Sequence, residues 1–196
     1  MADFVDGFVE GCGVTVRPSG TVTFLFTDVE GSTRLWAADS DAMSASLQVH
    51  DRILRWAIES FGGYVFTTAG DSFAAAFARA SDAVAAAAQA QRELAGAAWG
   101  SGPALRVRMG MHTGEAEGRG GDYYGPAVNR AARVSAAGHG GQILMGFDGL
   151  GQHLPITTTA RHGRVGTGEG GLVSLYRDGW PTWGRRGLPA LDAGTA

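Results

Sequence analysis

The hydrophobic pattern changes period along the chain, and each change predicts an element. A continuous apolar run at 21–26 is followed by small and polar residues, which predicts a buried strand and then a helix over 32–61 that kinks or restarts at an Asp-Ser-Asp sequence. β-Branched and aromatic residues at 64–68 and 73–77 flank an Ala-Gly-Asp-Ser turn, which predicts a hairpin with an acid at its tip.

The second half of the chain continues the alternation of helices and strands. Alanine-rich residues 81–98 favour a helix capped by Ser81 and Asp82, and strict alternation at 105–113 predicts a strand with one apolar face. A Gly-rich loop follows, and then a helix at 126–137 and strands at 142–145, 156–159 and 172–176.

The order strand, helix, strand, strand, helix, strand predicts an α+β fold. We expect a ferredoxin-like βαββαβ core with an antiparallel sheet and helices on one face, followed by a C-terminal α/β extension. Residues 1–19 are interpreted as an N-terminal arm or linker, 20–178 as one folded domain and 179–196 as a disordered tail.

Composition narrows the class of protein. The chain has 196 residues, 44% of them hydrophobic, which suits one well-packed domain. A net charge of −3 argues against a non-specific nucleic-acid binder. With one cysteine, no apolar run of about 20 residues and no signal peptide, we expect a cytoplasmic protein without a membrane span. All 16 basic residues are arginine, because the chain contains no lysine.

Asp28 and Asp71 are the first candidates for chemistry. Asp28 follows the first predicted strand and Asp71 lies at the tip of the hairpin, two elements that a βαββαβ sheet places side by side. Taken singly, each has an ordinary interpretation, as a helix cap or a turn residue. Together, two carboxylates at one sheet edge suit a divalent cation, and two metal ions bridging a triphosphate would also use the backbone carbonyl of Val29.

Two further groups suit a phosphorylated ligand. The N–H groups of Gly31, Ser32 and Thr33 open the predicted helix and can bind phosphate oxygens. Asn129 and Arg133 are four residues apart and therefore share a helix face. An amide and a guanidinium there suit the orientation of a ribose and the neutralisation of a phosphoryl transition state, with an ordinary solvated helix face as the alternative.

Three motifs together resemble a known family. They are Phe-Thr-Asp-Val-Glu-Gly-Ser-Thr at 26–33, Gly-Asp-Ser-Phe at 70–73 and Asp-Tyr-Tyr-Gly-Pro-Ala-Val-Asn-Arg-Ala-Ala-Arg at 122–133. Over about residues 20–146 the chain resembles the catalytic domain of class III nucleotidyl cyclases, notably the actinobacterial, mycobacterial-type adenylyl cyclases. The resemblance implies that the domain at 20–178 is a cyclase catalytic domain.

The resemblance also implies a reaction and an assembly. Members of the family work as head-to-tail dimers, so a homodimer is expected here. One subunit would bind two Mg²⁺ or Mn²⁺ ions per site through Asp28 and Asp71, and the other would supply Asn129 and Arg133. Asp122 matches the position whose carboxylate reads the adenine amino group. The 3′-hydroxyl of ATP, or of GTP as the alternative, would attack the α-phosphorus to give a cyclic nucleotide and pyrophosphate.

One part of the family pattern differs in this chain. The adenine-reading lysine of the Lys-Thr-x-Gly-Asp pattern is replaced by Thr67, and Arg161 or Arg164 would have to replace a second lysine that clamps the triphosphate. A degenerate cyclase-like domain that binds nucleotide or regulates a partner is therefore the alternative. A haloacid-dehalogenase-like phosphotransferase fits poorly, because it needs a second aspartate where the chain has Glu30.

Other conspicuous residues have simpler interpretations. His112 is expected to be a hydrogen-bonded structural residue, and Trp36 and Trp56 core or dimer-contact residues. The segment Gly118–Gly121 is expected to be a flexible loop over the dimer seam.

Overall fold

The computed structural model describes residues 17–148, 165–167 and 170–176, with side chains from 17 to 146. The helices are α1 (Ser32–Ala38), α2 (Ser40–Ser60), α3 (Ala80–Gly96) and α4 (Pro126–Ala136). The strands are β1 (Thr21–Val29), β2 (Tyr64–Ala69), β3 (Ser72–Phe77), β4 (Val107–Glu115), β5 (Glu117–Arg119), β6 (Asp122–Tyr124), β7 (Ile143–Asp148), β8 (Val165–Thr167) and β9 (Gly170–Tyr176).

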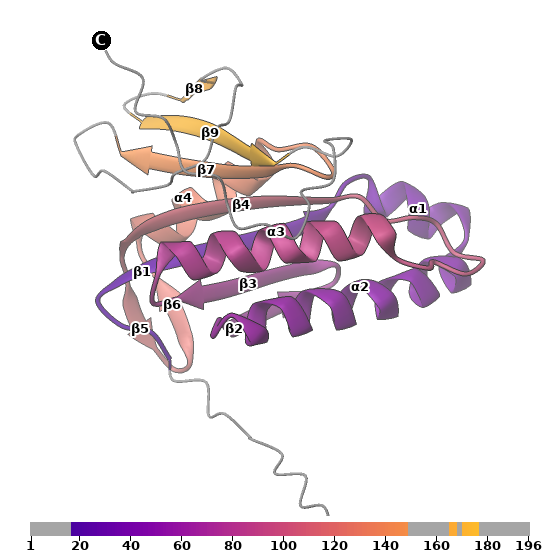
Figure 1. The fold of residues 1–196 in the computed structure, drawn as a ribbon, viewed down its shortest axis with the longest axis horizontal. Coiled ribbons are helices and arrows are strands. Elements are labelled where there is room, and N and C mark those ends of the chain that lie inside the picture. The colour runs from indigo at the N-terminus through magenta and orange to yellow at the C-terminus, as the bar shows by residue number, and fades with distance from the viewer. Residues whose placement is uncertain (1–16, 149–164, 168–169, 177–196) are drawn as a thin grey trace, which may run out of the picture.

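One seven-stranded sheet organises the chain (Figure 1). Its order is β2-β3-β1-β4-β7-β9-β8, and every neighbouring pair is antiparallel except β4 and β7. The first four strands have the ferredoxin-like order that the sequence predicts, with β1 in the centre between β3 and β4. Strands β7, β9 and β8 extend this sheet, whereas β5 and β6 form a separate two-stranded sheet. The predicted α+β fold is confirmed.

Helices α2 and α3 cover one face of this sheet, as expected for the two helices of the core (Figure 1). Alternate β1 residues such as Leu25 and Val29 point into this layer and are at most 2% exposed. The apolar side chains of β4 also pack into this layer, namely Val107, Met109 and Met111. This alternation confirms the period of two predicted for that strand.

Helix α4 covers the opposite face. Phe24 of β1 packs there with Tyr123, Ala127 and Ala131. The helix comes very close to β4 at Gly110, where an added Cβ would lie 2.1 Å from the backbone nitrogen of Ser135. Only a glycine leaves room for this contact, so the sequence of β4 fixes how closely α4 can pack.

Two predicted boundaries need correction and one is confirmed. The helix does restart at Asp39, whose carboxylate accepts the N–H of Ala42 at 2.9 Å. The predicted cap of α3 is wrong, because the helix begins at Ala80 and Ser81 donates to the Asp82 carboxylate instead. The predicted loop at 118–121 is also wrong: β5 and β6 form a hairpin around Gly120 and Gly121, whose φ angles of 60° and 87° suit a tight turn.

Several expectations lie outside the described residues. These are the first 16 residues of the arm predicted at 1–19, the strand at 156–159, Arg161 and Arg164, and the tail at 179–196. Among the helices that the structure describes, none combines the length and the apolar character that a bilayer crossing needs.

Candidate active site

Asp28 lies at the carboxyl end of β1, directly opposite Arg108 of β4. Its Oδ2 accepts from both Nε (2.8 Å) and Nη2 of Arg108, and its Oδ1 accepts from the hydroxyl of Ser72 at 3.1 Å. Both carboxylate oxygens are therefore held, although the Asp28 side chain is still 29% exposed. The carboxylate is oriented by the sheet and remains accessible to a ligand.

Asp71 lies in the β2–β3 turn and reaches the same place. Its Oδ2 accepts the backbone N–H of Val29 at 3.1 Å. The contacts from Asp71 to Val29 and from Ser72 to Asp28 connect the hairpin to the end of β1. The structure thus places both predicted carboxylates where β1 ends and β3 begins, at the same end of these neighbouring strands. Their role as metal ligands stays a prediction.

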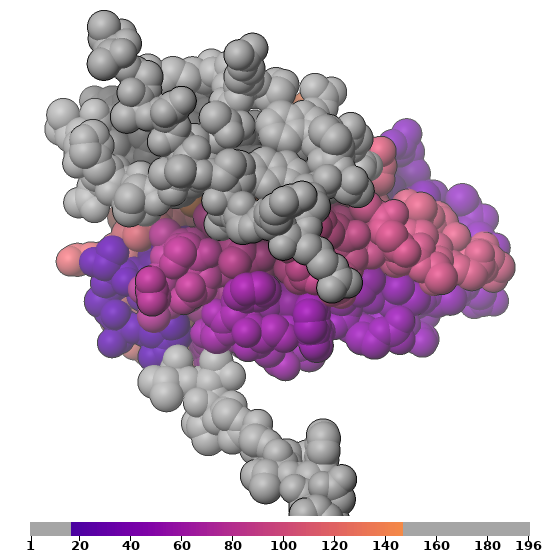
Figure 2. Space-filling model, in the orientation of Figure 1, coloured from indigo at the N-terminus to yellow at the C-terminus, as the bar shows by residue number. Residues whose placement is uncertain are grey.

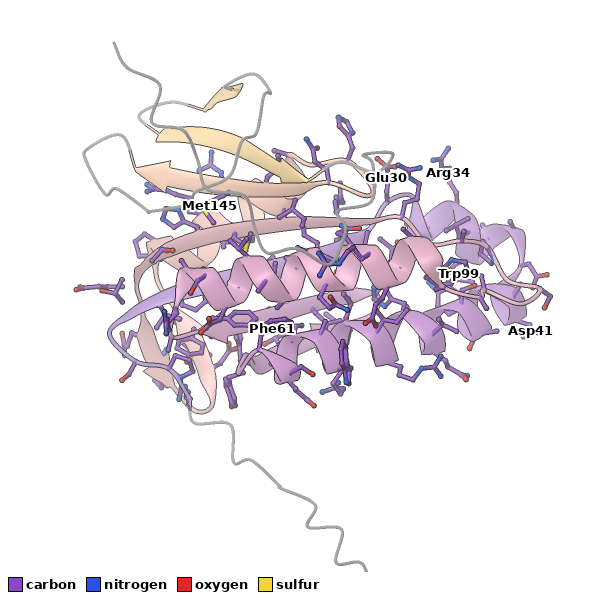
Figure 3. The ribbon with its side chains drawn as sticks, viewed as in Figure 1. Glu30, Arg34, Asp41, Phe61, Trp99 and Met145 are labelled. Atoms are coloured by element: carbon purple, nitrogen blue, oxygen red, sulfur yellow. The ribbon has the colours of Figure 1, made fainter. Side chains whose placement is uncertain are left out.

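The turn after β1 carries the predicted phosphate-binding residues. Gly31 has a φ of 72° and occupies the N-cap position of α1 without a side-chain cap. Its carbonyl accepts from the N–H groups of Arg34 and Leu35. Among the described residues no acceptor is found for the N–H groups of Ser32 and Thr33. Figure 3 shows Glu30 and Arg34 at this end of the molecule.

Arg108 is the site residue that the sequence analysis missed. In the sequence it is one polar position of an alternating strand, and nothing local distinguishes it from Arg106. Only the antiparallel register between β1 and β4 pairs it with Asp28. The sequence does contain a signal, because an arginine on the strand next to Asp28 is a candidate ion-pair partner for its carboxylate. Choosing between Arg106 and Arg108 requires the register of the two strands.

Asn129 and Arg133 lie on the exposed side of α4. The helix packs its other side, including Ala127 and Ala131, on the sheet. In the part of the chain that the structure describes, neither residue forms a hydrogen bond or ion pair with Asp28 or Asp71. One chain therefore presents the predicted carboxylates and the predicted helix face as two separate groups.

Asp122 and Thr67 belong to different elements. Asp122 lies in the β5–β6 hairpin, and Thr67 lies in β2, the edge strand of the seven-stranded sheet. Asp122 begins β6, and its carboxylate accepts the N–H of Tyr123 at 2.7 Å. Thr67 is exposed on edge strand β2, next to an irregularity in the pairing between Val65 and Thr67. The hairpin that carries Asp122 reaches β2 through the Tyr64 hydroxyl, which donates to the carbonyl of Gly121 at 3.3 Å.

Two buried histidines are structural in this arrangement. His112 is 3% exposed and its Nδ1 lies 3.0 Å from the carbonyl oxygen of Gly146, as expected for a structural residue. His50 of α2 is fully buried, with Nδ1 2.8 Å from the Asp51 carboxylate and no partner for Nε2 among the described residues. Burial lowers the pKa of both His50 and His112.

The interpretation of the tryptophans as core residues is wrong. Trp36 is 40% exposed and Trp56 51% exposed, because both lie on outer faces of their helices. The alternative interpretation, as contacts in a dimer, stays a prediction.

A protein-family comparison covers the region that contains these residues. The family model described as "Adenylate and Guanylate cyclase catalytic domain" matches residues 14–149. The match contains the whole of β1 to β7, and therefore both carboxylates, the β5–β6 hairpin and α4.

Individual relatives are similar over the same region. An uncharacterised protein of Mycobacterium tuberculosis is 43% identical over 130 residues, which cover 65% of this chain and 43% of that protein. An adenylate cyclase of Lachancea kluyveri is 36% identical over 184 residues, covering 81% of this chain and 10% of that enzyme. The chain thus spans less than half the length of these relatives.

Solved structures show the same fold. Adenylate cyclases from Trypanosoma brucei, solved in their monomeric state, superpose with a TM-score of 0.62 and 32% identity over 65% of this chain and 74% of the other. An adenylate/guanylate cyclase/hydrolase from Silicibacter pomeroyi superposes with a TM-score of 0.59 and 26% identity, over 65% of this chain and 76% of the other. With a family model that matches more than half of its length, this chain belongs to the family of adenylate and guanylate cyclase catalytic domains.

Proposed function

We propose that this domain converts a nucleoside triphosphate into its 3′,5′-cyclic monophosphate and pyrophosphate, with ATP as the preferred substrate and GTP as the alternative. The observation that carries the proposal is that Asp28 and Asp71 lie at the same end of β1 and β3, linked by the contacts from Val29 to Asp71 and from Ser72 to Asp28. Paired carboxylates with open coordination positions are what a metal-assisted phosphoryl transfer needs.

The donors at this end of the strands fit Mg²⁺ or Mn²⁺, two ions per site. Both cations prefer oxygen ligands, and the two carboxylates and the carbonyl of Val29 are oxygen donors. The described residues contain no cluster of three or more acidic, histidine or cysteine side chains, so substrate phosphates would complete the coordination. Bound there, the ions would lower the pKa of the 3′-hydroxyl and neutralise charge on the leaving pyrophosphate.

Arg108 gives this site a charge partner of its own. Its guanidinium binds Asp28 through two nitrogens and is 31% exposed. It compensates the repulsion between two neighbouring carboxylates. With a cation bound to Asp28, the Arg108 guanidinium would be able to bind a phosphate oxygen instead. The N–H groups of Ser32 and Thr33 would add neutral donors nearby.

A second copy of the chain would supply the remaining residues. The exposed face of α4 carries Asn129, suited to orienting the ribose, and Arg133, suited to binding the pentavalent α-phosphoryl group. The 3′-oxygen forms the new bond to the α-phosphorus, the bond to the β-phosphate oxygen breaks, and the 3′-hydroxyl proton leaves to solvent. A head-to-tail homodimer with composite sites brings the two groups together.

A direct assay tests this function. The protein is incubated with ATP or GTP and with Mn²⁺ or Mg²⁺, and cyclic nucleotides are separated and quantified. We expect cyclic AMP from the wild type and a loss of at least about a hundredfold in Asp71→Asn, which keeps the size of the side chain and removes its charge. The absence of a cyclic product under all four conditions would overturn the proposal.

The second candidate is a degenerate domain that binds nucleotide with weak or no turnover. Thr67 favours it, because a short exposed hydroxyl on β2 cannot replace the reach and the charge of a lysine. Thr67→Lys separates the two candidates. A gain in ATP turnover of about tenfold or more is expected if base recognition limits the wild type. An unchanged, near-zero rate with measurable nucleotide binding would favour the degenerate domain instead.

A further inference from the structure

The hairpin of β5 and β6 has little support of its own. Each strand has three residues, and the pair forms a sheet separate from the seven-stranded one. An isolated two-stranded hairpin is at best marginally stable in water. The position of Asp122 therefore depends on what holds the hairpin to the rest of the domain.

Arg17, four residues before β1, binds this hairpin through two interactions and lies close to both of its strands. Its guanidinium donates to the backbone carbonyl of Asp122. It also lies over the ring of Tyr123, 4.6 Å from the ring centroid. Gly118 of the facing strand leaves it room, since an added Cβ there would lie 2.5 Å from Nη2 of Arg17. The guanidinium thus lies against both strands of the hairpin.

Pro18 adds a second attachment next to the first. The Tyr123 hydroxyl donates to the Pro18 carbonyl at 2.6 Å in a buried position. Burial raises the pKa of Tyr123, so the hydroxyl keeps the proton that it donates. The Tyr123 ring then packs against Phe24 and Phe66, with centroids 5.2 and 5.1 Å away. Figure 2 shows the residues leading into β1, in indigo, at the surface at one end of the molecule.

We infer that Arg17 is a positioning residue for nucleobase recognition, acting through the backbone of Asp122. The carboxylate of Asp122 is bonded to the next N–H of its own strand, so its direction follows the path of the main chain. Arg17 fixes that path at the Asp122 carbonyl. The inference rests on the proposed function in one respect only, the use of Asp122 to read the base.

Hydrogen exchange tests the structural half of this inference without any turnover. In Arg17→Ala, the amides of residues 117–125 are expected to exchange at least about tenfold faster, because a charge-assisted hydrogen bond and a cation–π contact are lost. Tyr123→Phe keeps the ring and removes the bond to Pro18, and it is expected to loosen the same amides. Unchanged exchange in Arg17→Ala would overturn the inference.

Arg119→Ala is the matched control. Arg119 belongs to the same hairpin, and its guanidinium lies 4.9 Å from the ring centroid of the exposed Tyr124. The substitution removes the same charge and the same type of ring contact from the outer side of the hairpin. Exchange at 117–125 is expected to stay within about twofold of the wild type. Equal loosening by Arg119→Ala would mean that Arg17 has no special role.

Binding measurements test the recognition half. Calorimetry with the α,β-methylene analogues of ATP and GTP avoids turnover, because a methylene group replaces the oxygen between the α- and β-phosphorus and the resulting P–C bond is not cleaved. Arg17→Ala is expected to reduce the preference for the adenine analogue by about tenfold, while Arg119→Ala keeps it. A wild type without preference, or a preference that survives Arg17→Ala, would overturn the inference. A changed preference in a protein that makes no cyclic nucleotide would support it and refute the proposed reaction alone.

Discussion

The ion pair of Asp28 and Arg108 shows how a folded chain holds two carboxylates close together. Asp28 and Asp71 lie at the same end of neighbouring strands, where their charges repel each other. The guanidinium on the neighbouring strand offsets this repulsion, and the hydroxyl of Ser72 and the N–H of Val29 add directed bonds. The site is therefore ordered by the sheet itself before any ligand arrives.

We expect His50 and His112 to make the stability of the domain sensitive to acid. In the folded chain, burial holds the pKa of each ring below the ordinary value of 6.5. In the unfolded chain both rings are hydrated and have the ordinary pKa. As the pH falls below 6.5, the unfolded chain takes up protons that the folded chain does not, so the free energy of unfolding decreases until the folded pKa is reached. Urea denaturation between pH 7.5 and 5.5 should show this loss, and a constant or rising stability would contradict it.

One variant assigns the effect to a buried ring. His112→Gln retains a donor for the Gly146 carbonyl and removes a titrating group, so the acid sensitivity should become weaker. If the acid sensitivity of His112→Gln were as strong as that of the wild type, the His112 ring would not contribute to it.

Packing between elements depends on the glycines of β4. At Gly110 the backbone of α4 comes so close that an added Cβ would meet two backbone atoms of Ser135, at 2.1 and 2.4 Å. Backbone atoms cannot move aside as a flexible side chain can, so Gly110→Ala has to displace α4. We expect a destabilisation of about 1–3 kcal/mol, together with reduced activity because Asn129 and Arg133 move with the helix.

Gly96→Ala is the control for this substitution. Gly96 is the last residue of α3, and an added Cβ there meets nothing within 4 Å. Alanine favours a helix more than glycine does, so the variant should be as stable as the wild type or slightly more stable. Thermal unfolding of both variants checks the prediction, and a Gly110→Ala protein as stable as Gly96→Ala would refute the role of close packing.

Assembly can be tested by mixing two inactive proteins. If the carboxylates of one copy work with α4 of another, Asp71→Asn and Arg133→Ala are each inactive, yet their mixture regains activity. Random exchange of subunits gives one intact site in half of the dimers, which predicts about a quarter of the wild-type rate. Asp28→Asn mixed with Asp71→Asn should stay inactive, because both changes affect the same half of the site. Activity in the control, or none in the first mixture, would contradict a composite site.

The sequence alone determined the order of the elements and the place of the acids along them. Apolar period and turn composition are local properties, so the βαββαβ core, the Asp39 restart and the strand-end position of Asp28 were predictable. The same local reasoning failed at Gly118–Gly121, where glycine content indicated a loop, and at Trp36 and Trp56, whose apolar side chains face outward.

Only the tertiary structure decided which distant residues meet. The pairing of Asp28 with Arg108 spans 80 positions and depends on the register of two strands. The attachment of Arg17 to the Asp122 hairpin spans 105 positions, and neither residue carries a local sign of the other. Such contacts follow from how the layers pack, which depends on the whole set of core side chains and cannot be deduced from any single segment.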